Sequence, residues 1–241
     1  MAKEENAVRI QTSILNGVEK KVLVWIASHL PKWITSDMLT WFGVFGSFLV
    51  FLGYLLNNLL SAPAWIWLSS AGLVVNWFGD SLDGSIARVR KTQRPLYGFY
   101  LDHNIDCVTE FFMFIGIGLS GMCNLWVPML CFIPYLMLEV YVSINAHLKN
   151  EFKLTYGKMG PTELRLIIII CNTFLIYSEA MHSELGHIWH IGRIVLAEHV
   201  YILDYIGLAI FAILMLFYLG SFFKDLHYFA QIDPLKKPKK D

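Results

Sequence analysis

The chain has 241 residues, of which 56% are hydrophobic and only 16% are charged, and its 19 basic and 19 acidic residues leave no net charge. So much apolar content with so little charge excludes an ordinary soluble domain of this length. We expect a lipid bilayer, and no nucleic acid, among the partners of the protein.

The first segment, residues 1–34, is predicted to be cytoplasmic and to carry an amphipathic helix. Between residues 7 and 30 the apolar side chains recur at mostly helical spacing, and such a helix lies either in the membrane interface or against the protein's own surface. Pro31 ends the helix, and Thr35, Ser36 or Asp37 then caps the first membrane span. The apolar positions are Val8, Ile10, Ile14, Val18, Val22, Ile26 and Leu30.

Long apolar runs follow at 39–60, 64–78, 111–142, 164–177 and 200–223. A helix needs about 20 apolar residues to cross a membrane, so we divide the longest run, which contains Gly121, Asn124 and Pro128, into two helices. The runs then predict an all-α integral membrane protein with six transmembrane helices. After the first, the spans are 63–90, 98–121, 125–149, 164–181 and 200–224. They form one membrane domain, 35–227, which a basic cytoplasmic tail, 228–241, follows.

The basic residues are distributed unevenly along this arrangement. If the segment between the second and third spans is cytoplasmic, every basic residue except Arg193 falls on the cytoplasmic side. Membrane proteins show this bias toward their inner face. We therefore predict a multi-pass protein with both termini, and the junction of the second and third spans, in the cytoplasm.

Four aspartates interrupt the apolar pattern at that junction. On each of the two helices the aspartates are three or four residues apart, so they share one helix face with small residues. The two helices are expected to run antiparallel as neighbours across a linker, 89–97, with Gly84 and Gly98 keeping the backbones close. The faces consist of Asp80, Asp83, Gly84 and Ala87 on one helix and Gly98, Asp102 and Asp106 on the other.

The chemistry of this junction follows from its charge. Four carboxylates this close repel one another unless cations lie between them or some are protonated. Mg²⁺ and Mn²⁺ prefer carboxylate oxygens, and a pair of such ions is a common device for phosphoryl transfer. We therefore predict two divalent cations and a phosphoryl-transfer site, although the carboxylates could instead only cap helix ends and pair with arginines. Basic side chains suited to a diphosphate lie nearby: Arg88, Arg90, Lys91 and Arg94.

The stretch 80–106 resembles the signature of the CDP-alcohol phosphotransferase family, D-x-x-D-G-x-x-A-R followed by G-x-x-x-D-x-x-x-D. One departure is that nine residues, rather than the usual eight, separate Arg88 from Gly98. The resemblance implies phospholipid synthesis. A CDP-linked donor, CDP-diacylglycerol or a CDP-alcohol, passes its phosphate-bearing group to an acceptor hydroxyl, and CMP leaves. It also implies a homodimer.

The resemblance further implies a role for each residue of the motif. The four aspartates would be the metal ligands, and Asp106 would also be the general base that takes the hydroxyl proton. The nucleotide and its phosphates would be bound by Asp80, Gly84, Ala87, Arg88 and Gly98.

Further candidates flank the motif. His103 follows Asp102 as a histidine does in the choline and ethanolamine phosphotransferases of the family, and it could act as a base or contact a phosphate, although it points about 100° away around the helix. Glu139 in the fourth span and basic residues after that span could bind the acceptor, but the bias toward the inner face would also place basic residues there. The basic candidates are Lys149, Lys153, Lys158 and Arg165.

Two other functions fit parts of the pattern. A polytopic cation transporter would use the carboxylates as an ion path, but it would place them near the middle of the membrane rather than at helix ends beside arginines. A metal-dependent membrane phosphohydrolase would use the same cations with water as the acceptor.

Overall fold

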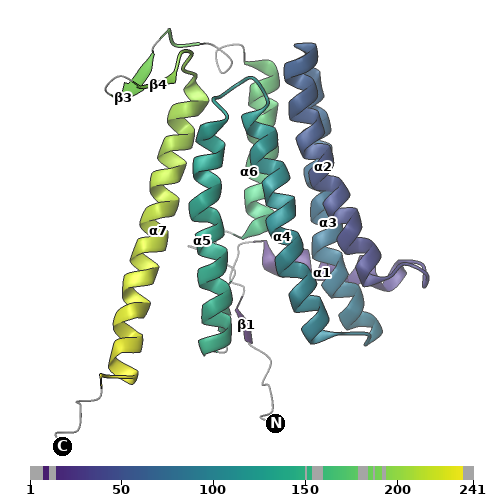
Figure 1. The fold of residues 1–241 in the computed structure, drawn as a ribbon. Helices are drawn as coiled ribbons and strands as arrows, with labels where there is room; N and C mark the ends of the chain where they lie inside the picture. The colour runs from purple at the N-terminus through teal and green to yellow at the C-terminus, as the bar shows by residue number, and fades with distance from the viewer. Residues whose placement is uncertain are drawn as a thin grey trace, which may run out of the picture.

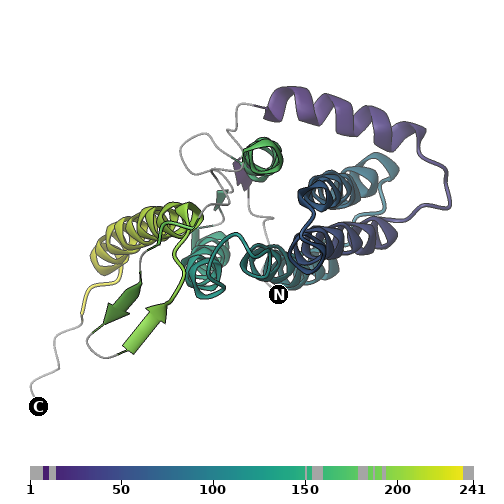
Figure 2. The same cartoon turned by 90° about the horizontal axis from the view of Figure 1, so that it is seen from above.

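The computed structural model describes residues 8–10, 15–149, 151–153, 160–178, 184–186, 188–191 and 194–235. In these ranges, helices dominate and confirm the all-α prediction. Six of them run side by side as a bundle, and α1 lies across one end of it (Figures 1 and 2). The helices are α1 (Asn16–His29), α2 (Ser36–Leu60), α3 (Ile66–Arg90), α4 (Pro95–Gly118), α5 (Trp126–Lys149), α6 (Pro161–Tyr177) and α7 (Ile202–Ile232).

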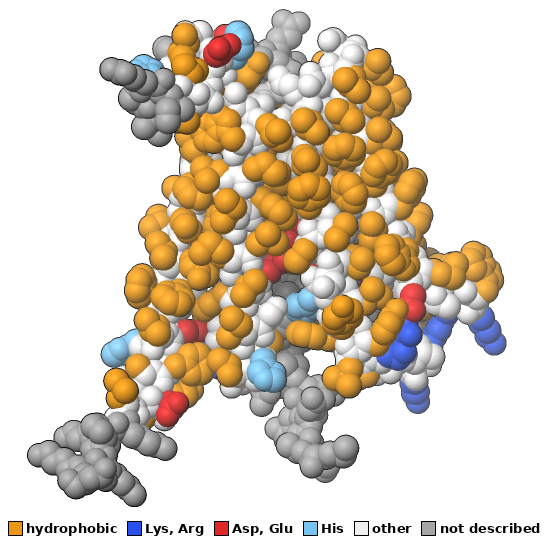
Figure 3. Space-filling model, viewed as in Figure 1, with side chains coloured by type: hydrophobic (Ala, Val, Ile, Leu, Met, Phe, Trp, Pro, Cys, Tyr) orange, Lys and Arg blue, Asp and Glu red, His pale blue; other side chains and the backbone are white. Residues whose placement is uncertain are grey.

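Among the described residues, three helices are long and apolar enough to cross a membrane: α2, α5 and α7. The other three helices of the bundle lie where spans are predicted, but α6 has only 17 residues, and α3 and α4 carry the aspartates in the halves next to the turn that joins them. The six-span arrangement therefore remains a prediction for α3, α4 and α6. Figure 3 shows apolar side chains covering the middle of one face of the bundle, with Lys and Arg side chains near one end.

Local capping fixes where the helices begin and end. The Thr35 hydroxyl accepts a hydrogen bond from the backbone N–H of Met38 (3.2 Å), so Thr35 is the cap among the three candidates. Lys91 ends α3 in the left-handed conformation (φ 57°), and Pro95 occupies the first turn of α4, where its missing N–H costs nothing. The predicted linker 89–97 is therefore wrong in length, because only residues 91–94 lie outside the two helices.

The N-terminal helix is shorter than predicted. It begins at Asn16 rather than near residue 7, because Val8–Ile10 forms strand β1, which pairs in parallel with β2 (Glu151–Lys153). Alternation of Val8 and Ile10 fits a strand as well as a helix, so the pattern alone could not decide between them.

One face of α1 packs on the protein's own domain. Glu19 accepts hydrogen bonds from the indole of Trp77 on α3 (2.8 Å) and from the hydroxyl of Thr162 on α6 (2.6 Å). Val18 and Trp25 on the other face are 67% and 63% exposed, which leaves an apolar surface at the end of the bundle. Packing on the domain is thus confirmed for one face of α1, while contact with the membrane interface remains a prediction for the other.

A second pair of strands, β3 (Trp189–Ile191) and β4 (Ile194–Ala197), forms an antiparallel ribbon at the opposite end of the bundle (Figure 1). Beside it, the carboxylate of Glu184 lies 2.6 Å from Nδ1 of His199 and raises the pKa of that imidazole. Asp204, in the first turn of α7, is fully buried. Its carboxylate accepts hydrogen bonds from the backbone N–H groups of Asn124 (2.7 Å) and Tyr201 (2.9 Å).

Glycines allow α2 and α3 to pack backbone against backbone. A β-carbon on Gly46 would lie 2.3 Å from the backbone nitrogen of Asn76, and one on Gly79 would lie 2.3 Å from the backbone nitrogen of Gly43. Real β-carbons do not approach other atoms so closely. The close pairing of α2 with α3 therefore requires glycine at both positions.

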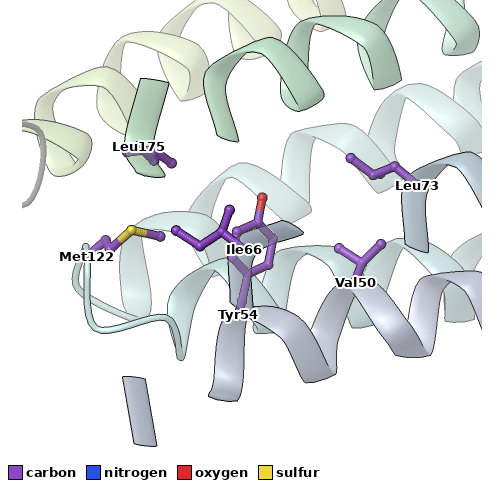
Figure 4. Packing of buried hydrophobic residues seen from close by; sticks show 6 residues of the cluster. All are labelled: Val50, Tyr54, Ile66, Leu73, Met122 and Leu175. Atoms are coloured by element: carbon purple, nitrogen blue, oxygen red, sulfur yellow. The ribbon is translucent and has the colours of Figure 1, made fainter. Parts of the chain in front are cut away.

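The core of the bundle joins α2, α3 and α6. Val50, Tyr54, Ile66 and Leu73 pack with Met122 and Leu175 (Figure 4), and Tyr54 is only 2% exposed. The Tyr54 hydroxyl donates to Oδ1 of buried Asn172 (2.6 Å), whose Nδ2 donates to the hydroxyl of Ser70 (3.1 Å). Because each buried polar group here has a partner, this network links three helices without leaving a polar group unsatisfied.

Candidate active site

The four aspartates of the motif line one small cavity in the half of the bundle nearer α1. Its walls come from α2, α3 and α4, and Figure 3 shows acidic side chains in a gap among the apolar ones on this side of the bundle. The lining residues are Thr40, Gly43, Val44, Asn76, Asp80, Asp83, Asp102, Ile105, Asp106 and Thr109. The prediction that two helices pool their aspartates thus holds in the structure.

The packing that creates this cavity differs from the prediction. The helices α3 and α4 do not pack as neighbours, because α2 packs extensively against both of them. Gly84 and Gly98 do not hold two backbones together either: a β-carbon at Gly98 would meet no atom within 4 Å, and one at Gly84 would meet only the side chain of Arg88. The aspartates of α3 and α4 therefore meet at a cavity whose third wall is α2.

Three of the aspartates have the spacing of a metal site. Carboxylate oxygens of Asp80, Asp102 and Asp106 lie within 4.8 Å of one another, and among the described residues they form the one group of this kind. Hard divalent cations such as Mg²⁺ and Mn²⁺ favour such an all-oxygen, anionic set of donors. The chemistry of the donors therefore fits the predicted cations.

Asp83 lies in the same cavity but is held from α2. The Thr40 hydroxyl donates to its Oδ2 (2.7 Å), and the backbone N–H of Gly84 donates to its Oδ1. A further bond from the Ser36 hydroxyl reaches the Asp83 carbonyl oxygen (2.9 Å). The bonds from Thr40 and Gly84 hold the Asp83 carboxylate in place on the cavity wall. Asp83 lies there one helical turn from Asp80.

Arg165 joins the site from α6, which the sequence could not place. Its Nη2 lies 2.6 Å from Oδ2 of Asp80, and its side chain is 16% exposed. The start of α6 is fixed nearby, since Glu163 accepts hydrogen bonds from the backbone N–H groups of Gly160 and Leu15, both at 2.9 Å. The site therefore combines four carboxylates with one guanidinium that suits a phosphate.

The residues assigned to the nucleotide lie toward the ends of α3 and α4 that residues 91–94 connect. Gly98 is exposed with open space around its α-carbon, Ala87 is partly buried, and exposed Arg88 donates to the Ser85 hydroxyl (3.0 Å). Arg90 belongs elsewhere: its guanidinium donates to the backbone carbonyl oxygens of Leu30 and Pro31, both at 2.9 Å, and so anchors the end of α1.

The remaining candidates lie around the site rather than in its cavity. His103 is outside the cavity lining, with Nδ1 3.1 Å from the carbonyl oxygen of Phe99. Glu139 on α5 accepts from the thiol of Cys107 (3.7 Å). Lys149 pairs with Asp225 on α7 (2.7 Å). Only the backbone of Lys153 is described, as part of β2, and Lys158 lies outside the described residues.

Three polar residues of the cavity were missed from the sequence: Thr40, Asn76 and Thr109. Thr109 donates to the carbonyl oxygen of Asp106 (2.9 Å), and Asn76 lies one turn before Asp80 on α3. Asn76 carries a signal that could have been used, because it is a polar residue inside an apolar run and four residues before an aspartate. Thr109 carries no comparable signal.

The fold and the site together define a class of protein. A bundle with membrane-spanning helices holds an acidic, cation-type site and an arginine near one end, the arrangement expected of a membrane protein that handles phosphate groups. Residues 33–201 match the family model of the CDP-alcohol phosphatidyltransferases. This match covers well over half of the 241 residues, and the chain belongs to that family.

Of two curated relatives, one is named as a transferase and the other as a synthase. The chain is 26% identical over 161 residues to cholinephosphotransferase 1 of Rattus norvegicus, covering 65% of this chain and 40% of that one. It is 30% identical over 116 residues to the phosphatidylinositol phosphate synthase of Cutibacterium acnes, covering 46% of this chain and 53% of that one. The matches thus span about half the length of these relatives.

Proposed function

We propose that the protein transfers a phospho-alcohol or phosphatidyl group from a CDP-linked donor to an acceptor hydroxyl, with release of CMP, in phospholipid synthesis. The observation that carries the proposal is the convergence of Asp80, Asp83, Asp102 and Asp106 on one cavity, with Arg165 against Asp80. Helices that pool carboxylates inside an apolar bundle have no structural need for that charge, since burying it is costly.

Asp80, Asp102 and Asp106 would hold two divalent cations, Mg²⁺ or Mn²⁺, together with Asp83. When bound, such cations neutralise the donor's diphosphate and polarise the phosphorus that is attacked. Two of the carboxylates are held in place by neighbouring side chains, Asp83 by the Thr40 hydroxyl and Asp80 by the Arg165 guanidinium.

Asp106 is the residue proposed to accept the hydroxyl proton. The acceptor oxygen forms a bond to the β-phosphorus of the donor, the bond from that phosphorus to the bridging oxygen breaks, and the electron pair leaves with CMP. Asp106 and Asp102 both line the cavity, and Asp106 is the farther of the two from the turn that joins α3 to α4. The nucleotide would then occupy the open end of the site near Gly98. Gly84, Ala87 and Arg88 would line that end.

The acceptor is proposed to approach from α5 and α6. Arg165 offers a guanidinium at the cavity, and Glu139 on α5 offers a carboxylate that could orient a hydroxyl. Lys149 is engaged by Asp225, so its contribution would require that ion pair to open. His103 is not among the residues that line the cavity, and it stays a candidate together with Lys153 and Lys158.

The relatives leave the donor open. One is named for transferring phosphocholine and the other for making phosphatidylinositol phosphate, so the lipid could enter on the acceptor or within the CDP donor. A CDP-alcohol and CDP-diacylglycerol are therefore both proposed donors.

The proposed topology places the site and both termini in the cytoplasm, with six spans in domain 35–227 and the tail 228–241 outside it. An even number of spans returns the chain to the side where it starts, and Figure 1 shows α1 and the end of α7 toward the same end of the bundle. Helix α7 continues to Ile232, so it extends past the predicted boundary of the tail. The homodimer is proposed from family analogy alone.

An assay of CMP release tests the proposal. Purified full-length protein with Mg²⁺ is given CDP-diacylglycerol or CDP-choline and a panel of acceptors that includes diacylglycerol, glycerol 3-phosphate and inositol phosphate. We expect CMP release that depends on one acceptor, stops in EDTA and returns with Mg²⁺ or Mn²⁺, because the carboxylates need cations to bind a diphosphate. CMP release without any acceptor would instead indicate a phosphohydrolase, and no release from any donor would favour a cation transporter.

Arg165→Gln tests the acceptor side of the site. If Arg165 holds a phosphate of the acceptor, we expect the variant to raise the KM for that acceptor by roughly ten- to a hundredfold while donor KM changes little, since a charge-assisted bidentate contact is lost. Lys224→Gln, which neutralises an exposed cation on α7, is the matched control and should keep wild-type kinetics. An unchanged acceptor KM for Arg165→Gln would show that Arg165 only positions Asp80.

A further inference from the structure

Asn76 is a polar residue of the cavity that the motif does not include. It lies on α3 one turn before Asp80, it is only 2% exposed, and it lines the same cavity as the four aspartates. A polar side chain buried this deeply among helices is expected to have its hydrogen-bonding groups satisfied.

Only one end of this amide is satisfied. Nδ2 of Asn76 donates to the backbone carbonyl oxygen of Gly43 on α2 (3.0 Å), which fixes the orientation of the amide, because a carbonyl oxygen can only accept. Oδ1 is buried and has no hydrogen-bond partner among the described residues. Asn172 shows the contrast, since its Oδ1 accepts from Tyr54 and its Nδ2 donates to Ser70.

None of the described residues that line the cavity donates a hydrogen bond to this oxygen. Ionised aspartates only accept hydrogen bonds, and the two threonine hydroxyls of the lining donate elsewhere, Thr40 to Asp83 and Thr109 to the carbonyl oxygen of Asp106. A buried acceptor without a donor destabilises the fold, which a protein tolerates where a ligand later supplies the partner. The ligand that suits an amide oxygen beside three carboxylates is a cation, or a water molecule bound to a cation.

We propose that Asn76 supplies a further oxygen to the cation site, through Oδ1, and that it sets the affinity of the site for divalent cations. The inference rests on the proposed function only in assuming that Asp80, Asp102 and Asp106 bind a cation. A neutral oxygen suits this position, because four carboxylates already balance two divalent cations, and a fifth carboxylate would add repulsion to the metal-free protein.

The test measures Mn²⁺ binding directly, by electron paramagnetic resonance on the purified full-length protein without any CDP substrate. Asn76→Ala is expected to weaken Mn²⁺ binding by about tenfold, the size of effect seen when a group that supports a metal site is lost. Asn57→Ala is the matched control: Asn57 is also buried and donates its Nδ2 to a backbone carbonyl oxygen, that of Ser120 (2.9 Å), but it lies outside the cavity. The control should bind Mn²⁺ as the wild type does.

The Asn76→Asp variant tests the contribution of the side-chain oxygen apart from that of the amide nitrogen. It keeps an oxygen at the cavity and removes the donor to Gly43, so at pH 8 it should bind Mn²⁺ at least about tenfold more tightly than Asn76→Ala. Equal binding by the two variants, or wild-type binding by Asn76→Ala, would overturn the inference and leave the transfer reaction intact. If the wild type itself binds no Mn²⁺, the proposed cation site falls together with the inference.

Discussion

Replacing Asp106 by asparagine is expected to lower acceptor-dependent CMP release by at least about a thousandfold while the protein still folds. The amide has nearly the same shape as the carboxylate, so the cavity keeps its form, but it can neither take the hydroxyl proton nor carry the charge that attracts a cation. Loss of a general base alone costs about 10²–10⁴ in rate, and loss of a cation ligand adds to that.

The stability of the same variant gives an independent check. Asp80, Asp102 and Asp106 have carboxylate oxygens within 4.8 Å of one another, so their charges repel when no cation is present. Removing one charge should therefore raise the melting temperature of Asp106→Asn in EDTA, and the further stabilisation that Mg²⁺ gives the wild type should shrink.

The matched control for Asp106→Asn is Glu184→Gln, a carboxylate-to-amide change at a residue that pairs with Tyr201 and His199, outside the cavity. It should keep wild-type CMP release. Near-normal release by Asp106→Asn, with the control also active, would remove Asp106 from the mechanism and leave the general base to be sought elsewhere, with His103 as the next candidate.

Replacing Gly79 by alanine is expected to destabilise the protein by about 3 kcal/mol, the upper part of the range for overpacking a core. The added β-carbon would lie 2.3 Å from the backbone nitrogen of Gly43 and 2.5 Å from the carbonyl oxygen of Leu39. Both atoms belong to the backbone of α2, so no side-chain rotation can relieve the contact, and α2 must move away from α3.

Two effects of this substitution on stability oppose each other, and their relative sizes decide whether the protein becomes less or more stable. Alanine favours a helix over glycine by about 1 kcal/mol, so an uncrowded glycine should gain stability when it is replaced. Gly220→Ala on α7 provides that control, because a β-carbon there meets no atom within 4 Å. We expect Gly220→Ala to match or exceed the wild type in thermal unfolding, whereas Gly79→Ala melts lower.

The displacement should also reach the site, because Gly79 immediately precedes Asp80. A misplacement of about 1 Å in a catalytic group can cost about a hundredfold in rate. We therefore expect CMP release by Gly79→Ala to fall at least about tenfold even at temperatures where the variant is folded. Wild-type stability and activity for this variant would show that α2 and α3 can separate without disturbing the aspartates.

Much of the site could be predicted because it is written in local spacing. Asp80 with Asp83, and Asp102 with Asp106, are three or four residues apart, and the 3.6-residue period of a helix puts each pair on one face whatever surrounds it. The family signature also depends only on these short distances along the chain. For the same reason the apolar runs placed α2 to α7 closely, and Pro95 correctly excluded a helix running from α3 into α4.

The sequence did not show which neighbouring segment packs against each helix face. Short elements such as Val8–Ile10 were misassigned because an alternation of two apolar residues fits strand and helix alike, and the strand forms only by pairing with Glu151–Lys153. The positive charges near the motif were equally ambiguous. Arg90 binds the carbonyl oxygens at the end of α1, whereas Arg165, far along the chain, reaches Asp80.

The sequence by itself thus determined the composition of a membrane bundle, the faces that carry the aspartates and the family to which the chain belongs. Only the tertiary structure decided that α2 packs against both α3 and α4, that Arg165 pairs with Asp80 and that Asn76 lines the cavity. The physical reason is that helix periodicity acts within a few residues. The choice of neighbours depends on contacts between distant segments, such as the backbone approach that Gly46 and Gly79 permit.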